Sequence, residues 1–114
     1  MDVNEMLEEI YERLKSNIAK DPAQEEILNE TLLRSMVERA YRDVKKARHY
    51  PKSYTQAMIE RDMLDYESNI EAIAEYDYEK TGGHAMTQYS ADGTSIHYID
   101  RNKLFEGVYR ISRM

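Results

Sequence analysis

SYTQAMIERDMLDYESNIEAIAEYDYEKTGG, residues 53–83, contains the most regular apolar pattern of this chain. Its apolar residues recur at steps of four, three, four and three, the spacing of one face of an α-helix. These residues are Ile59, Met63, Tyr66, Ile70 and Ile73. Ser53 is a suitable N-cap, and Gly82 and Gly83 supply the left-handed backbone that closes a helix C-terminus. The stretch therefore predicts a helix from Ser53 to about Lys80 with one face in a core.

Two more long helices are predicted upstream of this stretch. The first runs from Val3 to Ala19, where apolar residues recur at steps of three and four. Asp21 and Pro22 then stop it and start a second helix, with Asp21 as N-cap and Pro22 at the first helical position. This second helix extends to about Arg48, because the helical period of its apolar residues persists until Tyr50-Pro51 breaks it.

The pattern changes after the glycines. Asp92-Gly93 is a strong signal for a two-residue hairpin turn, and the pairing would place Tyr89 opposite Ile96. The flanking residues are polar, so a loop over residues 84–99 is almost as well supported as a short β-hairpin. Asp100 or Asn102 can cap a last short helix. Its apolar face consists of Leu104, Phe105, Val108 and Ile111.

These elements predict a mainly α-helical fold, a small antiparallel bundle of three long helices with a short C-terminal helix. The 114 residues are enough for one domain and contain no linker that would divide it. Within that domain we expect an N-terminal helix over residues 1–20 and core helices over 21–81. The loop or hairpin over 82–99 and a C-terminal segment over 100–114 then complete the chain.

The composition points to a small core and to contacts with other proteins. Leu, Ile, Val and Phe together supply only 21 residues, whereas Tyr and Met supply ten and seven. Tyr and Met suit surfaces that are buried on assembly, although a Tyr-rich core within a monomer explains them equally well. No cysteine is present, and no apolar run is long enough to span a bilayer. We therefore expect folding in a reducing cytoplasm and no membrane partner.

Charge is arranged in blocks along the chain. Residues 1–30 carry 3 basic and 9 acidic groups, and residues 31–56 carry 7 and 2. Residues 57–80 carry 2 and 8, and residues 81–114 carry 4 and 3. Two interpretations remain open. Oppositely charged helices complement each other within one subunit, or unlike faces meet between neighbouring copies, as a head-to-tail ring requires.

No residue pattern indicates catalysis or a bound cofactor. His84 and His97 match no zinc-ligand spacing, and His49 beside Pro51 suits the C-terminal end of a helix dipole. Carboxylates such as Glu67 and Glu71 lie on the polar face of a predicted helix, where solvation is the expected state. We predict a protein that is not an enzyme and that has no catalytic, cofactor-binding or metal site.

The basic residues between 34 and 52 support an alternative function. A cluster of Lys and Arg on one exposed helix face can bind phosphates, so a small helical nucleic-acid-binding or regulatory protein is the main competing hypothesis. The neighbouring helices are strongly acidic, and no recognition-helix or stacking motif accompanies the cluster. Neutralisation by the acidic third helix is the simpler explanation.

Residues 24–114 resemble the small helical head–tail connector proteins, also called head-completion adaptors, of tailed bacteriophages and prophages. In that family a long helix ends at glycine, a segment with Ser and Gly leads to an aromatic residue, and a leucine-led C-terminal stretch follows. The matching positions are Tyr78, Gly82, Gly83, Ser90, Gly93, Ser95, Tyr98, Leu104 and Ile111. The family often has a Glu-Gly step where this chain has Gly83-His84.

The resemblance implies a structural virion protein without enzymatic activity, located at the head–tail junction and in the host cytoplasm during assembly. Such adaptors form a homo-oligomeric ring of about a dozen copies on the portal protein. The ring prolongs the channel through which DNA passes without sequence-specific contact, and it offers a platform to the next head-completion or tail protein.

On this reading the body of the subunit is the helical bundle, and unlike charged faces meet between neighbours. The loop over residues 83–99 projects toward an adjacent ring, and the C-terminal apolar stripe anchors to the portal or the next subunit. The candidate interface residues are Arg34, Arg42, Lys45, Tyr89, Tyr98, Leu104, Phe105, Val108 and Ile111. Gly82, Gly83 and Gly93 are the expected structural glycines.

Overall fold

The first helix is defined by its N-terminal cap and its apolar stripe. The computed structural model describes residues 1–83 and 101–111, and α1 spans Val3–Ala19, as the sequence predicts. The Asp2 carboxylate accepts the Glu5 backbone N–H at 2.8 Å, and the Glu5 carboxylate accepts the Asp2 N–H at 3.1 Å. This reciprocal capping box satisfies two backbone donors at the helix start. The predicted stripe of α1 is largely buried.

The second predicted helix is interrupted, so the prediction of one continuous helix from Asp21 to Arg48 is wrong. A short α2 spans Pro22–Glu26, and α3 spans Glu30–Arg48. Asp21 caps α2 as predicted, through its contact with the Ala23 N–H at 3.0 Å. The Asn29 side chain then accepts the Leu32 N–H at 3.0 Å and caps α3. An N-cap residue takes an extended backbone conformation, and the helix therefore cannot continue through Asn29.

The third predicted helix is also built from several pieces. Thr55, and not Ser53, is its N-cap, because the Thr55 hydroxyl accepts the Met58 N–H at 3.1 Å. The segment comprises α4 over Gln56–Met63, the 3₁₀ turn η1 over Leu64–Tyr66, and α5 over Glu67–Tyr78. A wider π-helical turn, η2, continues over Glu79–Gly83, so Gly82 and Gly83 lie at the end of the helix as expected.

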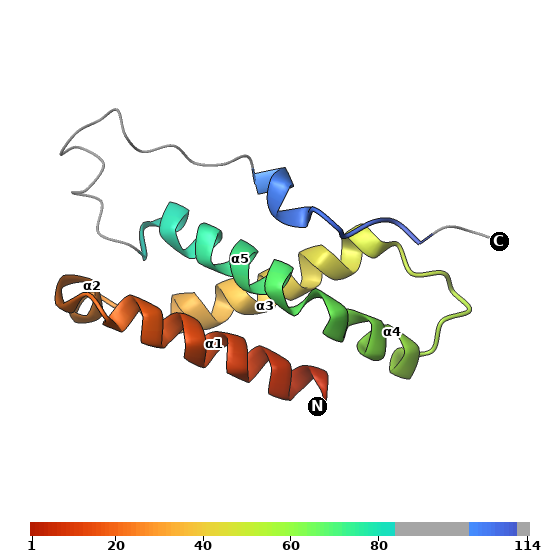
Figure 1. Ribbon diagram of the computed structural model, residues 1–114, viewed down its shortest axis with the longest axis horizontal. Helices are drawn as coiled ribbons and strands as arrows, with labels where there is room; N and C mark the ends of the chain where they lie inside the picture. The colour runs from red at the N-terminus through yellow and green to blue at the C-terminus, as the bar shows by residue number, and fades with distance from the viewer. Residues whose placement is uncertain (84–100, 112–114) are drawn as a thin grey trace.

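The core lies where α1, α3 and α5 meet. Figure 1 shows the three segments side by side, with α3 running against the direction of α1 and of α4–α5. The described part of the chain is mainly helical and contains no strand, and the molecule measures 52 × 28 × 16 Å. Its largest fully buried side chains come from all three segments. They are Tyr78, Met6, Ile10, Leu14, Leu33, Met63, Ile70, Ile73, Val37 and Val44.

The predicted short C-terminal helix is present, but it is shorter than expected and does not reach Val108 or Ile111. Only Arg101–Phe105 is helical, as the 3₁₀ turn η3. Gly107 then adopts a positive φ of 90°, which favours glycine and ends the turn. The Ile111 N–H donates to the Arg48 carbonyl at 2.9 Å, so the segment reaches the C-terminal end of α3. The predicted loop or hairpin over residues 84–99, with Tyr89, Gly93 and Tyr98, lies outside the described residues.

Candidate interaction surfaces

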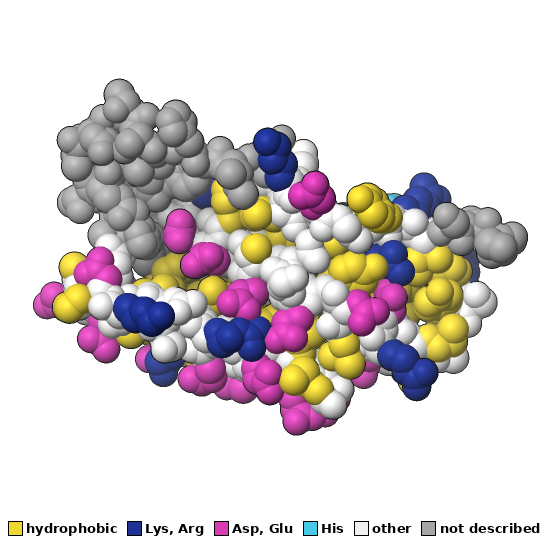
Figure 2. Space-filling view, viewed as in Figure 1, with side chains coloured by type: hydrophobic (Ala, Val, Ile, Leu, Met, Phe, Trp, Pro, Cys, Tyr) yellow, Lys and Arg dark blue, Asp and Glu magenta, His cyan; other side chains and the backbone are white. Residues whose placement is uncertain are grey.

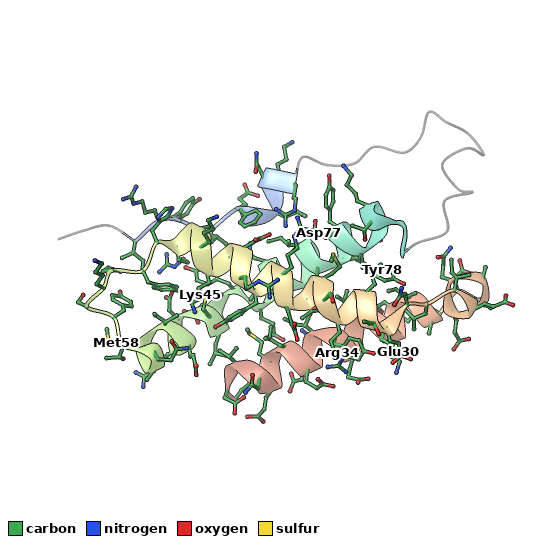
Figure 3. The ribbon with its side chains drawn as sticks, turned by 180° about the vertical axis from the view of Figure 1, so that it is seen from behind. Glu30, Arg34, Lys45, Met58, Asp77 and Tyr78 are labelled. Carbon is green, nitrogen blue, oxygen red and sulfur yellow. The ribbon has the colours of Figure 1, made fainter. Side chains whose placement is uncertain are left out.

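The basic face of α3 divides into paired and unpaired residues. Arg34 lies near the start of the helix, where α3 passes α1 (Figure 3). It donates to both carboxylate oxygens of Glu8 on α1, at 2.8 and 3.4 Å. Its guanidinium also stacks over the Tyr11 ring, 3.9 Å from the centroid. The hydrogen bond from Arg34 lowers the pKa of Glu8. Arg34 therefore joins α1 to α3 within one subunit, as the interpretation of internal charge complementarity expects.

Arg48, near the other end of α3, is also held within the subunit. Its Nε donates to the Asp62 carboxylate of α4 at 2.9 Å, and its Nη1 donates to the Tyr109 carbonyl at 2.6 Å. The Tyr50 hydroxyl donates to the same Asp62 oxygen at 2.6 Å. This group ties α3, α4 and the C-terminal segment together.

We expect Tyr50→Phe to destabilise the protein by about 1 kcal/mol at neutral pH, because it removes one partly buried hydrogen bond. Burial, and then the hydrogen bond to Asp62, raises the pKa of Tyr50. Because the pKa of Tyr50 is higher in the folded protein than in the unfolded chain, its protonated hydroxyl stabilises the folded state fully below about pH 10, the ordinary phenol pKa. This stabilisation is lost as the pH rises toward the pKa that Tyr50 has in the folded state. The difference between wild type and variant should therefore shrink above about pH 10.

Urea unfolding at neutral and alkaline pH measures this difference. Tyr109→Phe is the matched control, because Tyr109 is 68% exposed. If the difference in the free energy of unfolding between wild type and Tyr50→Phe stays constant across the alkaline range, the hydrogen bond from the Tyr50 hydroxyl to Asp62 does not stabilise the fold.

The middle of the basic face is not neutralised by the described residues. Within residues 1–83 and 101–111, no carboxylate lies within ion-pair distance of Arg42, Lys45 or Lys46. Arg42 and Lys46 are exposed, and Lys45 is half-buried. We call Arg42, Lys45 and Lys46 the basic strip. It is the part of the predicted basic face that remains for a partner.

Acidic groups on the third segment serve internal pairing. Arg13 of α1 donates to Glu67 at 2.6 Å and to Glu71 at 2.9 Å. These two carboxylates therefore link α1 to α5. The exposed acids of α1, by contrast, gather on a face that Figure 2 shows as a row of Asp and Glu side chains.

The C-terminal segment is fastened to α3 and α5 by a cluster around Arg101. Its guanidinium donates to both carboxylate oxygens of Asp77, at 2.8 and 2.7 Å, and to Asp43 at 2.7 Å. The Asp77 side chain is only 7% exposed. The hydrogen bond to Asp77 raises the pKa of Arg101, which stays charged. Asn69 of α5 adds two contacts, donating to the Leu104 and Glu106 carbonyls at 2.9 Å each.

The predicted C-terminal interface residues pack against this chain's own core. Val108 is 7% exposed, and Leu104 and Phe105 are partly buried against the same cluster. Ile111 is half-buried. The exposed residues of the segment are Asn102, Lys103, Glu106, Gly107, Tyr109 and Arg110. While the segment stays docked, a partner meets these residues and not the apolar ones.

Sequence reasoning missed the Arg101 cluster. Asp77 stands four residues after Ile73, so it continues the buried stripe of the third segment. A carboxylate at a core position indicates a buried partner, because an unpaired charge is costly there. That signal was present in the sequence. The identity of the partner was not, because Arg101 lies 24 positions away.

Two open grooves border the C-terminal end of α3. One has a volume of about 470 Å³ and is lined by His49, Tyr50, Pro51, Lys52, Ser53, Arg110 and Ile111. The other lies between α3 and the C-terminal segment, and its lining includes Lys46, Lys103, Phe105 and Tyr109. Both are bordered by basic and apolar side chains, and the second is also bordered by Asp43 and Glu106. Figure 2 shows hydrophobic, Lys and Arg side chains together at the end of the molecule where α4 begins.

The part of the chain that the structure describes shows neither a metal-binding cluster nor a membrane-spanning helix. Among the described residues, no three His, Asp or Glu side chains are grouped so as to hold a metal ion. His84 and His97 lie outside those residues. No helix in the described ranges combines the length and apolar character needed to cross a bilayer.

Comparison with protein-family models, curated proteins and solved structures gives no match for this chain.

Proposed function

We propose that this chain is a structural subunit of a bacteriophage head–tail connector. It assembles with further copies into a ring at the portal vertex of the virion, extends the DNA channel and provides the platform on which the tail attaches. The proposal includes an antiparallel bundle of three long helices as the body of the subunit. Residues 84–99 form a loop or short hairpin that faces an adjacent ring.

The observation that carries the proposal is the separation of unpaired charge. The basic strip on α3 has no carboxylate partner among the described residues, although Arg34 and Arg48 on the same helix do. On α1, Glu12 is exposed and has no ion pair among the described residues. Unlike surfaces on one molecule suit a heterologous contact, in which each copy offers one surface to each neighbour. Such contacts close into rings when the rotation between copies permits.

The order of elements gives independent support. The resemblance rests on a long helix that ends at glycine and on a leucine-led C-terminal stretch. The third helical segment ends in η2, which contains Gly82 and Gly83, and Leu104 begins the apolar part of the C-terminal segment. Tyr78, another position of the resemblance, is fully buried in the core.

The test is binding to a portal ring. Purified chain is mixed with assembled phage portal protein, and negative-stain microscopy and mass measurement follow. We expect additional density of the chain around the portal axis, with a mass that corresponds to many copies. Failure to bind portal rings overturns the proposal. A monomer in the absence of portal does not, because assembly can depend on the portal as template.

Reversing two charges of the basic strip should weaken this assembly. We expect Arg42→Glu combined with Lys45→Glu to reduce assembly on the portal at least about tenfold, because like charges then face each other. The free energy of unfolding should change by less than about 0.5 kcal/mol, since neither residue has an ion pair among the described residues. Arg61→Glu, an exposed arginine on α4, is the control. Unchanged assembly of the double variant removes the basic strip from the ring contact.

Nucleic-acid binding by residues 34–52 is the alternative function, and the unpaired basic strip favours it. It predicts affinity for DNA that falls steeply with salt, because each neutralised phosphate releases counterions. The connector proposal predicts little binding, since the chain carries a net charge of −6 and no recognition-helix or stacking motif accompanies the basic residues. Titration of fluorescent duplex DNA at several salt concentrations separates the two.

A further inference from the structure

The molecule is elongated, and its two ends differ in chemistry. Its longest dimension is 52 Å, against 28 and 16 Å for the others. Figure 1 shows α2 at one end and the connection between α3 and α4, together with the last described residues, at the opposite end. A contact between unlike ends of two copies is therefore geometrically available without any change of fold.

One end carries an exposed isoleucine among acids, and we call residues 20–27 the acidic tip. Ile27 follows the last turn of α2, and its side chain is 50% exposed, as are three other large hydrophobic side chains among the described residues to similar extents. The tip also contains one base, Lys20, and three exposed acids. These acids are Asp21, Glu25 and Glu26.

The other end carries a groove with the complementary chemistry, which we call the basic socket. It is the groove of about 470 Å³ described above, formed where the left-handed His49 ends α3 and the chain turns toward α4. Tyr50, Pro51 and Ile111 supply half-buried apolar surface, and Lys52 and Arg110 are exposed. No carboxylate is among the described residues that line it.

We propose that the acidic tip of one copy docks in the basic socket of a second copy. Ile27 packs on the apolar surface of the socket, and Glu25 and Glu26 approach Lys52 and Arg110. This inference rests on the proposed function, because it takes another copy of the chain as the partner. Charge complementarity selects that partner, since the tip has an excess of acids and the socket is lined by bases and apolar groups.

The contact is heterologous and small. Each copy has one tip and one socket at opposite ends, so association continues in one direction or closes into a ring. Stable protein interfaces bury about 1,200–2,000 Å² in total, which is more than a single tip and groove offer. We therefore expect weak association of free copies, and stronger association where a template holds many copies close together. Salt should weaken it by screening the charges.

Engineered cysteines test the geometry directly, because the chain has no cysteine of its own. Protein with Ala23→Cys, an exposed position of the tip that leaves Ile27 in place, is mixed with protein carrying Ser53→Cys and treated with a short bismaleimide. We expect heterodimers to form at least about tenfold faster than in the control mixture of Ala23→Cys with Ser16→Cys, which places the second thiol on the exposed face of α1. Equal rates in the two mixtures overturn the inference.

Charge exchange provides a second test that is insensitive to folding defects. One variant carries Glu25→Lys and Glu26→Lys, and the other carries Lys52→Glu and Arg110→Glu. Each alone should associate less than wild type in concentrated solution, measured by sedimentation. Their mixture should associate again, because each variant tip then meets an oppositely charged socket and each native tip meets a native socket. Failure of the mixture to recover association overturns the inference.

The outcomes distinguish this inference from the proposed function. If the cysteine pair fails to cross-link selectively but the chain still forms rings on the portal, the tip–socket contact is wrong and the connector function stands. If the pair cross-links selectively and charge exchange restores association but no portal ring is bound, the contact stands and the connector function is wrong.

Discussion

Arg101→Met is expected to destabilise the protein by roughly 2–4 kcal/mol. Removing one partner of a fully buried ion pair costs about 3–5 kcal/mol, because the other charge stays buried without compensation. Asp77 fits that description, with its side chain only 7% exposed. The cost is lower here because the Arg101 side chain is itself 31% exposed, so that water can partly replace it.

The measurement is urea unfolding of Arg101→Met beside Arg110→Met. Arg110 lies on the same segment and is exposed, and it has no ion pair among the described residues. We expect a change below about 0.5 kcal/mol for this control. The double variant Asp77→Asn with Arg101→Met should be less destabilised than the sum of the two single variants, because it removes both charges of the pair. Equal stability of the two arginine variants contradicts the role of the Arg101 cluster.

The same variant shows whether the C-terminal segment detaches as a unit. Arg101 joins the segment to α3 through Asp43 and to α5 through Asp77. The Asn69 contacts and the burial of Val108 follow within a few residues. We expect backbone amides between 101 and 111 to exchange with solvent faster in Arg101→Met, while those of α1 keep their protection. Detachment would expose Val108 and the partly buried Leu104 and Phe105 to a partner.

The sequence predicted elements whose signals are local. The bounds of α1 followed from an apolar stripe that starts and stops with its helix, and the start of α2 followed from Asp21-Pro22. The break between α2 and α3 was missed because Ile27 and Leu28 keep the helical period across it. The Asn29 cap, and not a loss of the apolar period, separates α2 from α3.

The candidate site shows the same limit. Periodicity placed all the bases of α3 on one polar face, but it could not tell which of them meet a carboxylate. Arg34 finds Glu8 at a separation of 26 positions, and Arg48 finds Asp62 at 14. Only after these pairs are known does the basic strip emerge as the unpaired part. The choice of interface residues therefore depends on tertiary contacts that no local pattern contains.

The second large loss of stability is expected at Tyr78, whose side chain contacts the break between α2 and α3. This side chain is fully buried, and its hydroxyl accepts the Asn29 backbone N–H at 3.2 Å. Tyr78→Ala should cost about 3–5 kcal/mol, as other buried aromatic truncations do, which is a large share of the 5–15 kcal/mol typical of a whole domain. Tyr76→Ala, two residues earlier and half-buried, is the matched control and should cost clearly less.

Tyr78→Phe separates the packing of the ring from the hydroxyl contact. It keeps the ring in the core but leaves the partly buried Asn29 N–H without its acceptor, so we expect a loss of about 1–2 kcal/mol by urea unfolding. Amide exchange should also become faster from Ile27 to Leu32, because the hydroxyl fixes the start of α3 against the end of α5. If Tyr78→Phe matches wild type in both measurements, the Asn29 side chain alone determines where the helix is broken. In that case the effect of Tyr78→Ala reports only the cavity left by the ring.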